Sequence, residues 1–427
     1  MLKTRRLSLI CLFALLTAGL AGQKNVSSPY ARYGIGNLEL QGTFKTLAMG
    51  GISSGIRNNL TLNYLTPASY SSIDTASFLF DFGIDYSVIR LKDREQGYFS
   101  QDLGFSHLLL GFPIMKRWGF AAGIVPYSDG YYYIAQTTTP DQGTEVAGNV
   151  YEYHKGIGGY QKALIGTAVS PFKYFSLGVN GFIVFGDINR TNDYILTSDE
   201  NNFNTRKYGT TAIRGISYEA SAQLMIPFSE KKFINAGFTY SPSFTINSSS
   251  EEVIMRYSTV RTSLYAFDTL YSGKSEASGR LPYILRGGLA FGNKDKLTIG
   301  ADVVYSGWSE AVIPYGYGTY ANSLSLHAGA EYIPDKYSNY SFFDRMEYRI
   351  GCRYGESYAL YDGKQVNEYG ITFGAGIPLR RSLSRVSLYV DVSSRGNTDG
   401  NLFRETRFAV GASLNLFDFW FLKAKYE

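Results

Sequence analysis

Cysteine, histidine and charge are scarce in this sequence. Its 427 residues include 2 Cys, 3 His and 12 Pro, and charged residues make up 18% of the chain, below the roughly 25% usual for soluble domains. Cys11 lies in a segment that we expect to be removed, so Cys352 has no intramolecular partner and a disulfide scaffold is excluded. His107, His154 and His327 share no ligand spacing with acidic residues or cysteine, and no metal site or cofactor is predicted.

The chain has no basic tract. Its formal net charge is +5, and three of the basic residues, Lys3, Arg5 and Arg6, belong to the leader described next, which leaves +2 on the remainder. Nucleic acid is therefore not expected as a partner.

Residues 1–21 are predicted to be a secretory signal peptide. A basic start precedes an apolar run at 7–16, and small residues lead up to Ala21, where we expect cleavage. The run is too short to span a bilayer, which takes about 20 residues; an uncleaved anchor helix is the alternative. No second apolar run of spanning length follows, so the exported chain is periplasmic, secreted or an outer-membrane barrel.

Glycine and aromatic residues are abundant instead. The chain contains 46 Gly, 36 Tyr and 28 Phe, which favours β-structure because aromatic side chains suit pleated surfaces and glycine suits turns and bulges. Apolar and polar residues alternate with period two at 78–88, 216–226, 297–305, 324–332, 346–354 and 369–377. This pattern is typical of strands with one apolar and one polar face.

Long and short connections alternate between the predicted strands. Seven long connections, the second to fourth at 129–159, 189–209 and 247–280, and six short ones separate fourteen strands, which is the outer-membrane barrel arrangement. A soluble β-sandwich also alternates. The signal peptide, strands long enough to cross a bilayer at a tilt, and charges of both signs on the polar face together favour the barrel.

We therefore predict an all-β protein, a 14-stranded antiparallel transmembrane β-barrel over residues 76–427 in the outer membrane, in contact with outer-membrane lipid. Aromatic residues near strand ends, such as Trp118, Tyr174, Trp308 and Tyr332, are expected at the lipid–water boundary. The charged and polar residues predicted to line the lumen are Asp81, Asp85, Glu219, Arg286, Asp302, His327, Glu331, Glu347, Arg349, Arg353, Glu368, Asp391 and Arg407.

Residues 22–75 lack this alternation. Glycines punctuate a polar stretch, and 41–47 is predicted as a short helical turn. The segment is too short for a domain of its own, and we predict that it is a plug, or hatch, in the barrel lumen.

Three stretches resemble the FadL-type family of outer-membrane long-chain fatty acid transporters. Residues 47–69 resemble the plug of the family, 111–120 its second and third strands, and 411–426 its closing strand. Asn63, Thr66, Pro67 and Ala68 fall on the plug motif, where Thr66 stands in place of the usual Asn.

The resemblance implies passive, energy-independent uptake of hydrophobic compounds such as long-chain fatty acids, with lumenal capture and lateral release. The third strand supplies Gly123 and Pro126 as candidates for a lateral gate, because proline removes a ladder hydrogen bond; the alternative is that the strand already leaves the membrane there. The fourth long connection supplies an apolar groove, for which packing of an outer hairpin is the alternative. The groove candidates are Val253, Ile254, Met255, Tyr257, Leu264, Tyr265 and Phe267.

A second hypothesis is a non-transporting barrel subunit of a larger outer-membrane complex for protein secretion or assembly, with protein partners. The Thr66 departure and the long connections favour it. An enzyme is not expected. Residues 51–55 fit the G-x-S-x-G pattern around Ser53, but that motif requires a strand-to-helix elbow. His327 and Glu331 share a strand face, where lumenal polar groups usually satisfy one another.

Overall fold

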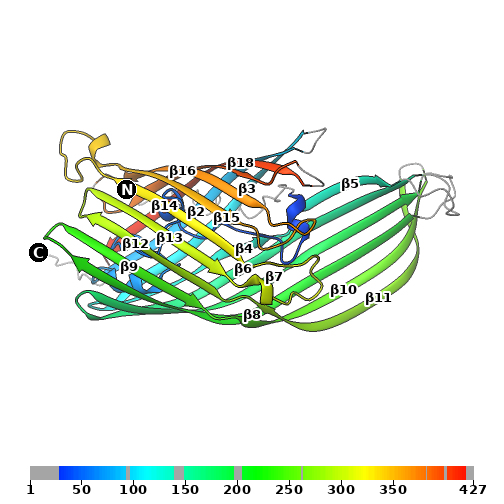
Figure 1. Ribbon diagram of the computed structural model, residues 1–427, viewed down its shortest axis with the longest axis horizontal. Coiled ribbons are helices and arrows are strands. Elements are labelled where there is room, and N and C mark those ends of the chain that lie inside the picture. Colours follow the sequence, from blue (N-terminus) through cyan, green and yellow to red (C-terminus); the bar gives the residue numbers. More distant parts are fainter. Residues whose placement is uncertain are drawn as a thin grey trace, which may run out of the picture.

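The computed structural model describes residues 28–92, 97–138, 149–196, 204–260, 263–380, 382–398 and 402–419. The predicted signal peptide and residues 22–27 of the predicted plug lie outside these ranges. The strands form one antiparallel sheet that closes on itself (Figure 1). They are β1 (Asn37–Leu38), β2 (Ser77–Lys92), β3 (Gly97–Met115), β4 (Trp118–Asp129), β5 (Tyr132–Thr138), β6 (Val150–Phe172), β7 (Phe175–Leu196), β8 (Asn204–Pro227), β9 (Lys232–Ser241), β10 (Phe244–Val260), β11 (Ser263–Leu281), β12 (Ile284–Asn293), β13 (Leu297–Ser306), β14 (Ser323–Tyr332), β15 (Glu347–Glu356), β16 (Asn367–Pro378), β17 (Arg385–Arg395) and β18 (Arg404–Phe419).

Helical structure is confined to short turns. These are η1 (Pro29–Arg32), α2 (Phe44–Leu47), η2 (Pro67–Ser72), η3 (Trp308–Glu310) and η4 (Phe343–Arg345). The helical turn predicted at 41–47 corresponds to α2. In the described part of the chain, no helix has the length and apolar character needed to cross a membrane.

The 18 strands build a barrel of fourteen. β1 belongs to the N-terminal segment, and β5, β10 and β11 continue β4, β9 and β12 beyond an interruption, which removes four from the count. Pro242 and Pro282 stand at two of these interruptions, because proline cannot donate a ladder hydrogen bond. β18 pairs with β2 along its whole length and closes the ring. The predicted 14-stranded antiparallel barrel is confirmed.

The second, third and fourth long connections are largely strand, so their prediction as loops was wrong. β6, β7 and β8 contain 23, 22 and 24 residues, and β10 and β11 form a hairpin over most of 247–280. Because about 9–11 residues cross a bilayer, roughly half of each long strand stands outside it. Figure 1 shows these strands sweeping past the rest of the barrel at one end, here called the long-strand end. A sheet with water on both faces needs no apolar face, which is why period-two alternation fades there.

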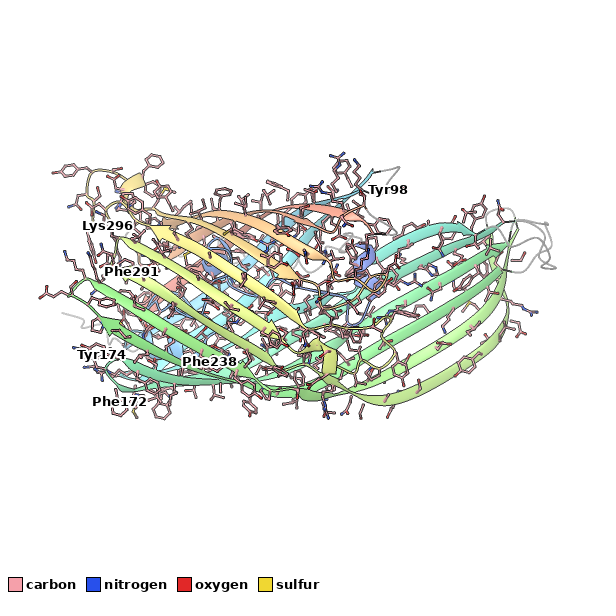
Figure 2. The ribbon with its side chains drawn as sticks, in the orientation of Figure 1. Tyr98, Phe172, Tyr174, Phe238, Phe291 and Lys296 are labelled. Atoms are coloured by element: carbon pink, nitrogen blue, oxygen red, sulfur yellow. The ribbon has the colours of Figure 1, made fainter. Side chains whose placement is uncertain are left out.

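Side chains divide between the two faces of the wall. In β2, Asp81 and Ser87 point inward and are buried, whereas Ile84 and Tyr86 point outward and are exposed. Side chains cover the outside of the barrel along its length (Figure 2). Trp308 was wrongly placed at the lipid boundary: it is 1% exposed and packs on Tyr358, with ring centroids 4.2 Å apart.

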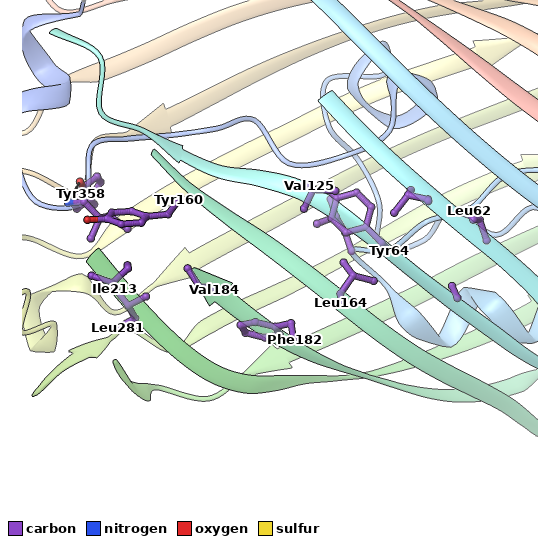
Figure 3. Packing of buried hydrophobic residues seen from close by; sticks show 14 of the residues in the cluster. Leu62, Tyr64, Val125, Tyr160, Leu164, Phe182, Val184, Ile213, Leu281 and Tyr358 are labelled. Atoms are coloured by element: carbon purple, nitrogen blue, oxygen red, sulfur yellow. Dashed lines mark hydrogen bonds between the residues drawn. The ribbon is translucent and has the colours of Figure 1, made fainter. Parts of the chain in front are cut away.

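The largest apolar cluster lies inside the barrel. Side chains of the N-terminal segment 28–76, among them Leu62 and Tyr64, pack against the inner face of β4, β6, β7 and β8, which contribute Val125, Leu164 and Phe182 (Figure 3). The apolar material in the lumen is therefore a packed core that fixes the segment to the inner face of the barrel.

Candidate functional site

The N-terminal segment 28–76 is hydrogen-bonded to the barrel wall at several points. The Oδ2 atom of Asp302 on β13 accepts bonds from the backbone nitrogens of Ser53 and Ser54, at 2.7 and 2.8 Å, and from both of their hydroxyls. The backbone N–H of Gly50 donates to Thr372 on β16, at 2.9 Å. His327 Nδ1 lies 2.6 Å from the carbonyl oxygen of Gly50, which can only accept, so Nδ1 carries the proton and donates.

Wall glycines let the segment approach the strands closely. A Cβ atom added at these positions would lie within 2.5 Å of segment backbone, a distance that real side chains do not adopt. The positions are Gly119 against Tyr70, Gly178 against Ala68, Gly237 against Ser54, Gly329 against Met49 and Gly351 against Gly50. Sequence analysis did not identify these glycines as site residues. The available signal was their position on the inward-facing register of strands whose apolar and polar residues alternate.

The plug motif folds as a turn that leads into η2. The side-chain amide of Asn63 donates to the carbonyl oxygens of Ser53 and Ile56, at 2.8 and 3.2 Å. The N–H of Ala68 donates to Ser221 on β8, at 2.7 Å, and Pro67 occupies the first turn of η2. Thr66 is fully buried, and its hydroxyl has no hydrogen-bond partner in the described residues.

Ion pairs fill one side of the lumen. In the Arg349 network, Arg349 binds Glu331 at 2.8 Å and also pairs with Glu347. Lys45 of the segment reaches Glu331 at 3.2 Å, and Arg385 pairs with Glu347. Because Lys45 comes from α2, this network ties the segment to β14, β15 and β17.

A second group, the Arg353 network, lies on neighbouring strands. Arg353 binds Glu368 at 2.9 Å and also pairs with Asp391. Arg407 binds Asp391 at 3.1 Å and Asp85 at 3.5 Å. Alternating charges on β2, β15, β16, β17 and β18 thus neutralise one another across the interior.

The remaining predicted lumenal residues also have polar partners inside the barrel. Asp81 lies 3.2 Å from His107, and Glu219 pairs with Lys162. Arg286 donates to the hydroxyl of Ser53 at 3.4 Å. His327 and Glu331 contact different partners, so the structure does not assemble an acid–base pair from them. No group of three metal-ligating side chains occurs among the residues that the structure describes.

Replacing Arg349 by methionine should lower the free energy of unfolding by about 3–5 kcal/mol, because removing one partner leaves buried carboxylates uncompensated. Urea unfolding in lipid vesicles measures the change. Lys274→Met provides the matched control: Lys274 and Glu251 pair at 3.4 Å but both are largely exposed, so the loss there should be below about 1 kcal/mol. Equal losses in the two variants would show that the Arg349 network does not hold the fold.

The wall bends inward at β4. The pairs between β3 and β4 end at Leu108 and Ile124. Beyond that point Ser128 pairs with Leu38 of β1, and Gln41 donates to the carbonyl oxygen of Pro126 at 2.8 Å. Pro126 therefore lies at the bend, beside a bulge in the β4–β6 ladder.

The second gate candidate, Gly123, lies before the bend. It is opposite Leu109 in the regular part of the β3–β4 ladder. The two predicted gate residues are thus separated by the point at which β4 leaves β3.

Four of the seven apolar groove candidates have described side chains, all on β10. Val253, Ile254 and Met255 are half-buried on β10. Tyr257 is 2% exposed and lies under the guanidinium of Arg206, 5.1 Å from its ring centroid. The side chains of Leu264, Tyr265 and Phe267 lie outside the described part of the structure.

Two cavities inside the barrel are small, and both polar and apolar side chains line them. One, of about 130 Å³, lies behind the bend and is lined by Pro126, Phe105, Arg407 and others. The other, of about 250 Å³, adjoins His327 and Arg353. Both fall below the roughly 300–1,000 Å³ typical of ligand pockets.

These features define a barrel of the outer-membrane type whose interior is occupied by the N-terminal part of its own chain. The sequence matches the model of the BamG family over residues 1–427, and the chain belongs to that family. No curated protein matches it.

Solved structures of similar fold include hydrocarbon channels and a FadL homologue. The CymD monoaromatic hydrocarbon channel gives a TM-score of 0.57 at 12% identity, over 88% of this chain and 97% of that one. The Pseudomonas putida toluene transporter TodX gives 0.56 at 16%, over 91% and 100%. A Pseudomonas aeruginosa FadL homologue gives 0.54 at 15%, over 94% and 100%. The resemblance seen in the sequence therefore holds for the fold, whereas the family is a different one, BamG.

Proposed function

We propose that this protein is a barrel subunit of a larger outer-membrane complex for protein secretion or assembly, and that its barrel does not conduct hydrophobic solutes. Residues 1–21 act as the export signal, and 22–75 act as a fixed plug. One observation carries the proposal: the lumen is filled by a segment whose backbone is bound to the wall through Asp302, Thr372 and Ser221.

The two cavities inside the barrel, of about 130 and 250 Å³, leave little room for an apolar solute. A hydrophobic molecule that entered the cavity beside Arg353 and Glu368 would displace solvent from charged groups without replacing its hydrogen bonds, which is costly. Membership of BamG, a family distinct from the channels of similar fold, also supports a separate role. The sheet that extends beyond the bilayer at the long-strand end offers surface to protein partners.

Native extraction tests this function. Membranes of the source organism are dissolved in mild detergent, and the protein is followed with an antibody on native gels. We expect it to migrate with other proteins, well above its own mass of 47.5 kDa. Migration as a single chain, together with oleate uptake by proteoliposomes of the purified barrel, would overturn the proposal.

A passive channel for hydrophobic compounds such as fatty acids is the second candidate, and the inward bend of β4 at Pro126 favours it. If the bend is a lateral gate, Pro126→Val should restore a ladder donor and slow the uptake of a hydrophobic substrate several-fold, since a proline blocks regular pairing. Oleate uptake by proteoliposomes provides the measurement, with folding checked on gels. Unchanged uptake by a folded variant would count against the gate.

A further inference from the structure

The short connections at the end opposite the long strands, here called the short-turn end, are rich in positive charge. The described residues of these connections include ten basic residues but only four acidic ones, Glu230, Asp295, Asp335 and Asp344. This excess of six exceeds the net charge of +5 on the whole chain. The basic residues are Lys116, Arg117, Lys173, Lys231, Lys232, Lys294, Lys296, Lys336, Arg345 and Arg380.

A vestibule of about 820 Å³ opens at this end. It is lined by the β6–β7, β8–β9 and β12–β13 turns and by the 57–60 stretch of the N-terminal segment. Figure 2 shows Lys296 and Tyr174 at this end of the barrel. Its volume lies within the range of ligand-binding pockets, unlike that of the two cavities deeper in the lumen.

The acidic residues of the vestibule mostly have cationic partners already. Glu331 and Glu347 belong to the Arg349 network, and Asp295 pairs with Lys336. By contrast, the cations Arg57, Lys173, Lys232 and Lys296 make no ion pair with any carboxylate in the described residues. The vestibule therefore presents uncompensated positive charge toward its open side.

Arg57 is the most deeply placed of these cations. Its guanidinium donates to the hydroxyls of Ser176, Ser71 and Ser170, the last two at 3.1 and 3.2 Å. These three bonds leave two of its five N–H groups for another acceptor. Burial lowers the pKa of Arg57 to about 10, and no acidic group offsets that effect. A partly buried cation held only by neutral hydroxyls is more stable when an anion completes its shell.

We propose that this vestibule binds an acidic segment of a partner polypeptide, with carboxylates bound by Arg57 at the base and by Lys173, Lys232 and Lys296 at the rim. The inference names the chemistry of a partner for the proposed subunit role and rests on that role. Short turns of outer-membrane barrels face the periplasm, so the partner is a periplasmic protein or domain.

The position of the vestibule favours a polypeptide over anionic lipid. Lipid headgroups surround the outside of the wall, whereas Arg57 belongs to the segment inside the ring of strands. The 334–346 connection, which contains Lys336, adds four exposed aromatic side chains: Tyr337, Tyr340, Phe342 and Phe343. Aromatic residues are enriched at the cores of protein interfaces, and this connection is ordered by its own hydrogen bonds, such as that between Asp335 and Asp344.

A direct binding measurement tests the inference. The mature protein in nanodiscs of zwitterionic lipid is titrated with a fluorescein-labelled peptide of ten glutamates, followed by anisotropy at about 0.15 M salt, where the screening length is about 8 Å. We expect saturable binding that Arg57→Gln weakens about tenfold, which corresponds to about 1.4 kcal/mol. The double variant Lys232→Gln/Lys296→Gln should weaken it about fivefold; it decides the matter if Arg57→Gln does not fold.

The matched control removes two charges from the same face but outside the vestibule lining. Lys116→Gln/Arg380→Gln should change the affinity by less than about twofold, since distant exposed charges are screened by salt. An equal loss of peptide affinity in both double variants would show that the peptide binds to diffuse surface charge rather than to the vestibule, and would overturn the inference. Displacement of the peptide by short-chain phosphatidylglycerol, but not by short-chain phosphatidylcholine, would overturn it in favour of a lipid headgroup.

The outcome can be separated from that of the proposed function. A native complex that persists in the Lys232→Gln/Lys296→Gln strain would overturn the vestibule as the contact and leave the subunit role standing. Absence of a complex in the wild-type strain would remove the subunit role, whereas peptide binding is measured on the isolated barrel.

Discussion

Replacing Gly351 by valine is expected to force the N-terminal segment out of its place in the lumen. A Cβ atom at this position of β15 would lie 2.0 Å from the backbone nitrogen of Gly50 and 2.2 Å from the carbonyl carbon of Met49. Gly50 cannot retreat, because it has a φ of +73° and its own Cβ position is 2.5 Å from the carbonyl oxygens of Ala328 and Cys352. We expect a loss of more than about 4 kcal/mol, the range of severe core substitutions.

Trypsin measures the displacement directly. Lys45 is 4% exposed, so the folded wild-type barrel should resist cleavage there, whereas the variant should be cut. Gly287→Val on β12 is the control, because its nearest neighbour would be the Phe238 ring, 3.8 Å away. If the two variants are cut at the same rate, close approach of segment and wall does not hold the segment.

The second large effect is expected for Asp302→Ala. Two buried backbone donors, at Ser53 and Ser54, would lose their acceptor, at roughly 1–3 kcal/mol each, for a total of about 4 kcal/mol. Loosening the segment should also open the lumen to water. Proteoliposomes of the variant should therefore swell in small sugars, whereas wild-type proteoliposomes should not.

Asp302→Asn separates the hydrogen bonds from the packing. The amide keeps an acceptor oxygen at nearly the same place but loses the charge, so about half of the stability loss and little swelling are expected. Swelling equal to that of Asp302→Ala would mean that the charge, rather than the acceptor, closes the barrel.

The barrel was predictable because lipid imposes a simple rule on its strands. Outward side chains must be apolar, so β2, β13, β14, β15 and β16 show clean alternation and were recognised. The same rule does not apply beyond the bilayer. The outer halves of β6, β7 and β8 mix polar and apolar residues on both faces. Their ladders, such as Tyr194 opposite Thr205, depend on neighbours that the local sequence does not specify.

The lumenal residues were predictable one at a time, but their partners were not. Inward register marks Glu331 and Arg349, yet only the strand pairing places them opposite one another. Lys45 joins them from a distant helix, because the segment crosses the lumen. The vestibule was missed for the same reason: Lys173, Lys232 and Lys296, from three separate turns, meet only once the ring closes, and Arg57 reaches them from inside.

The ring closes between the first and last strands, β2 and β18, and this has a consequence for biogenesis. Ser28, at the start of the described segment, binds Glu405 at the beginning of β18, and Arg395 of β17 reaches Ser28 at 3.1 Å. The segment is enclosed by strands on every side, and its backbone touches glycines all around the wall. The segment must therefore be in position before β2 and β18 pair. The part of the chain that is synthesised first then serves as a template around which the last strand closes the barrel.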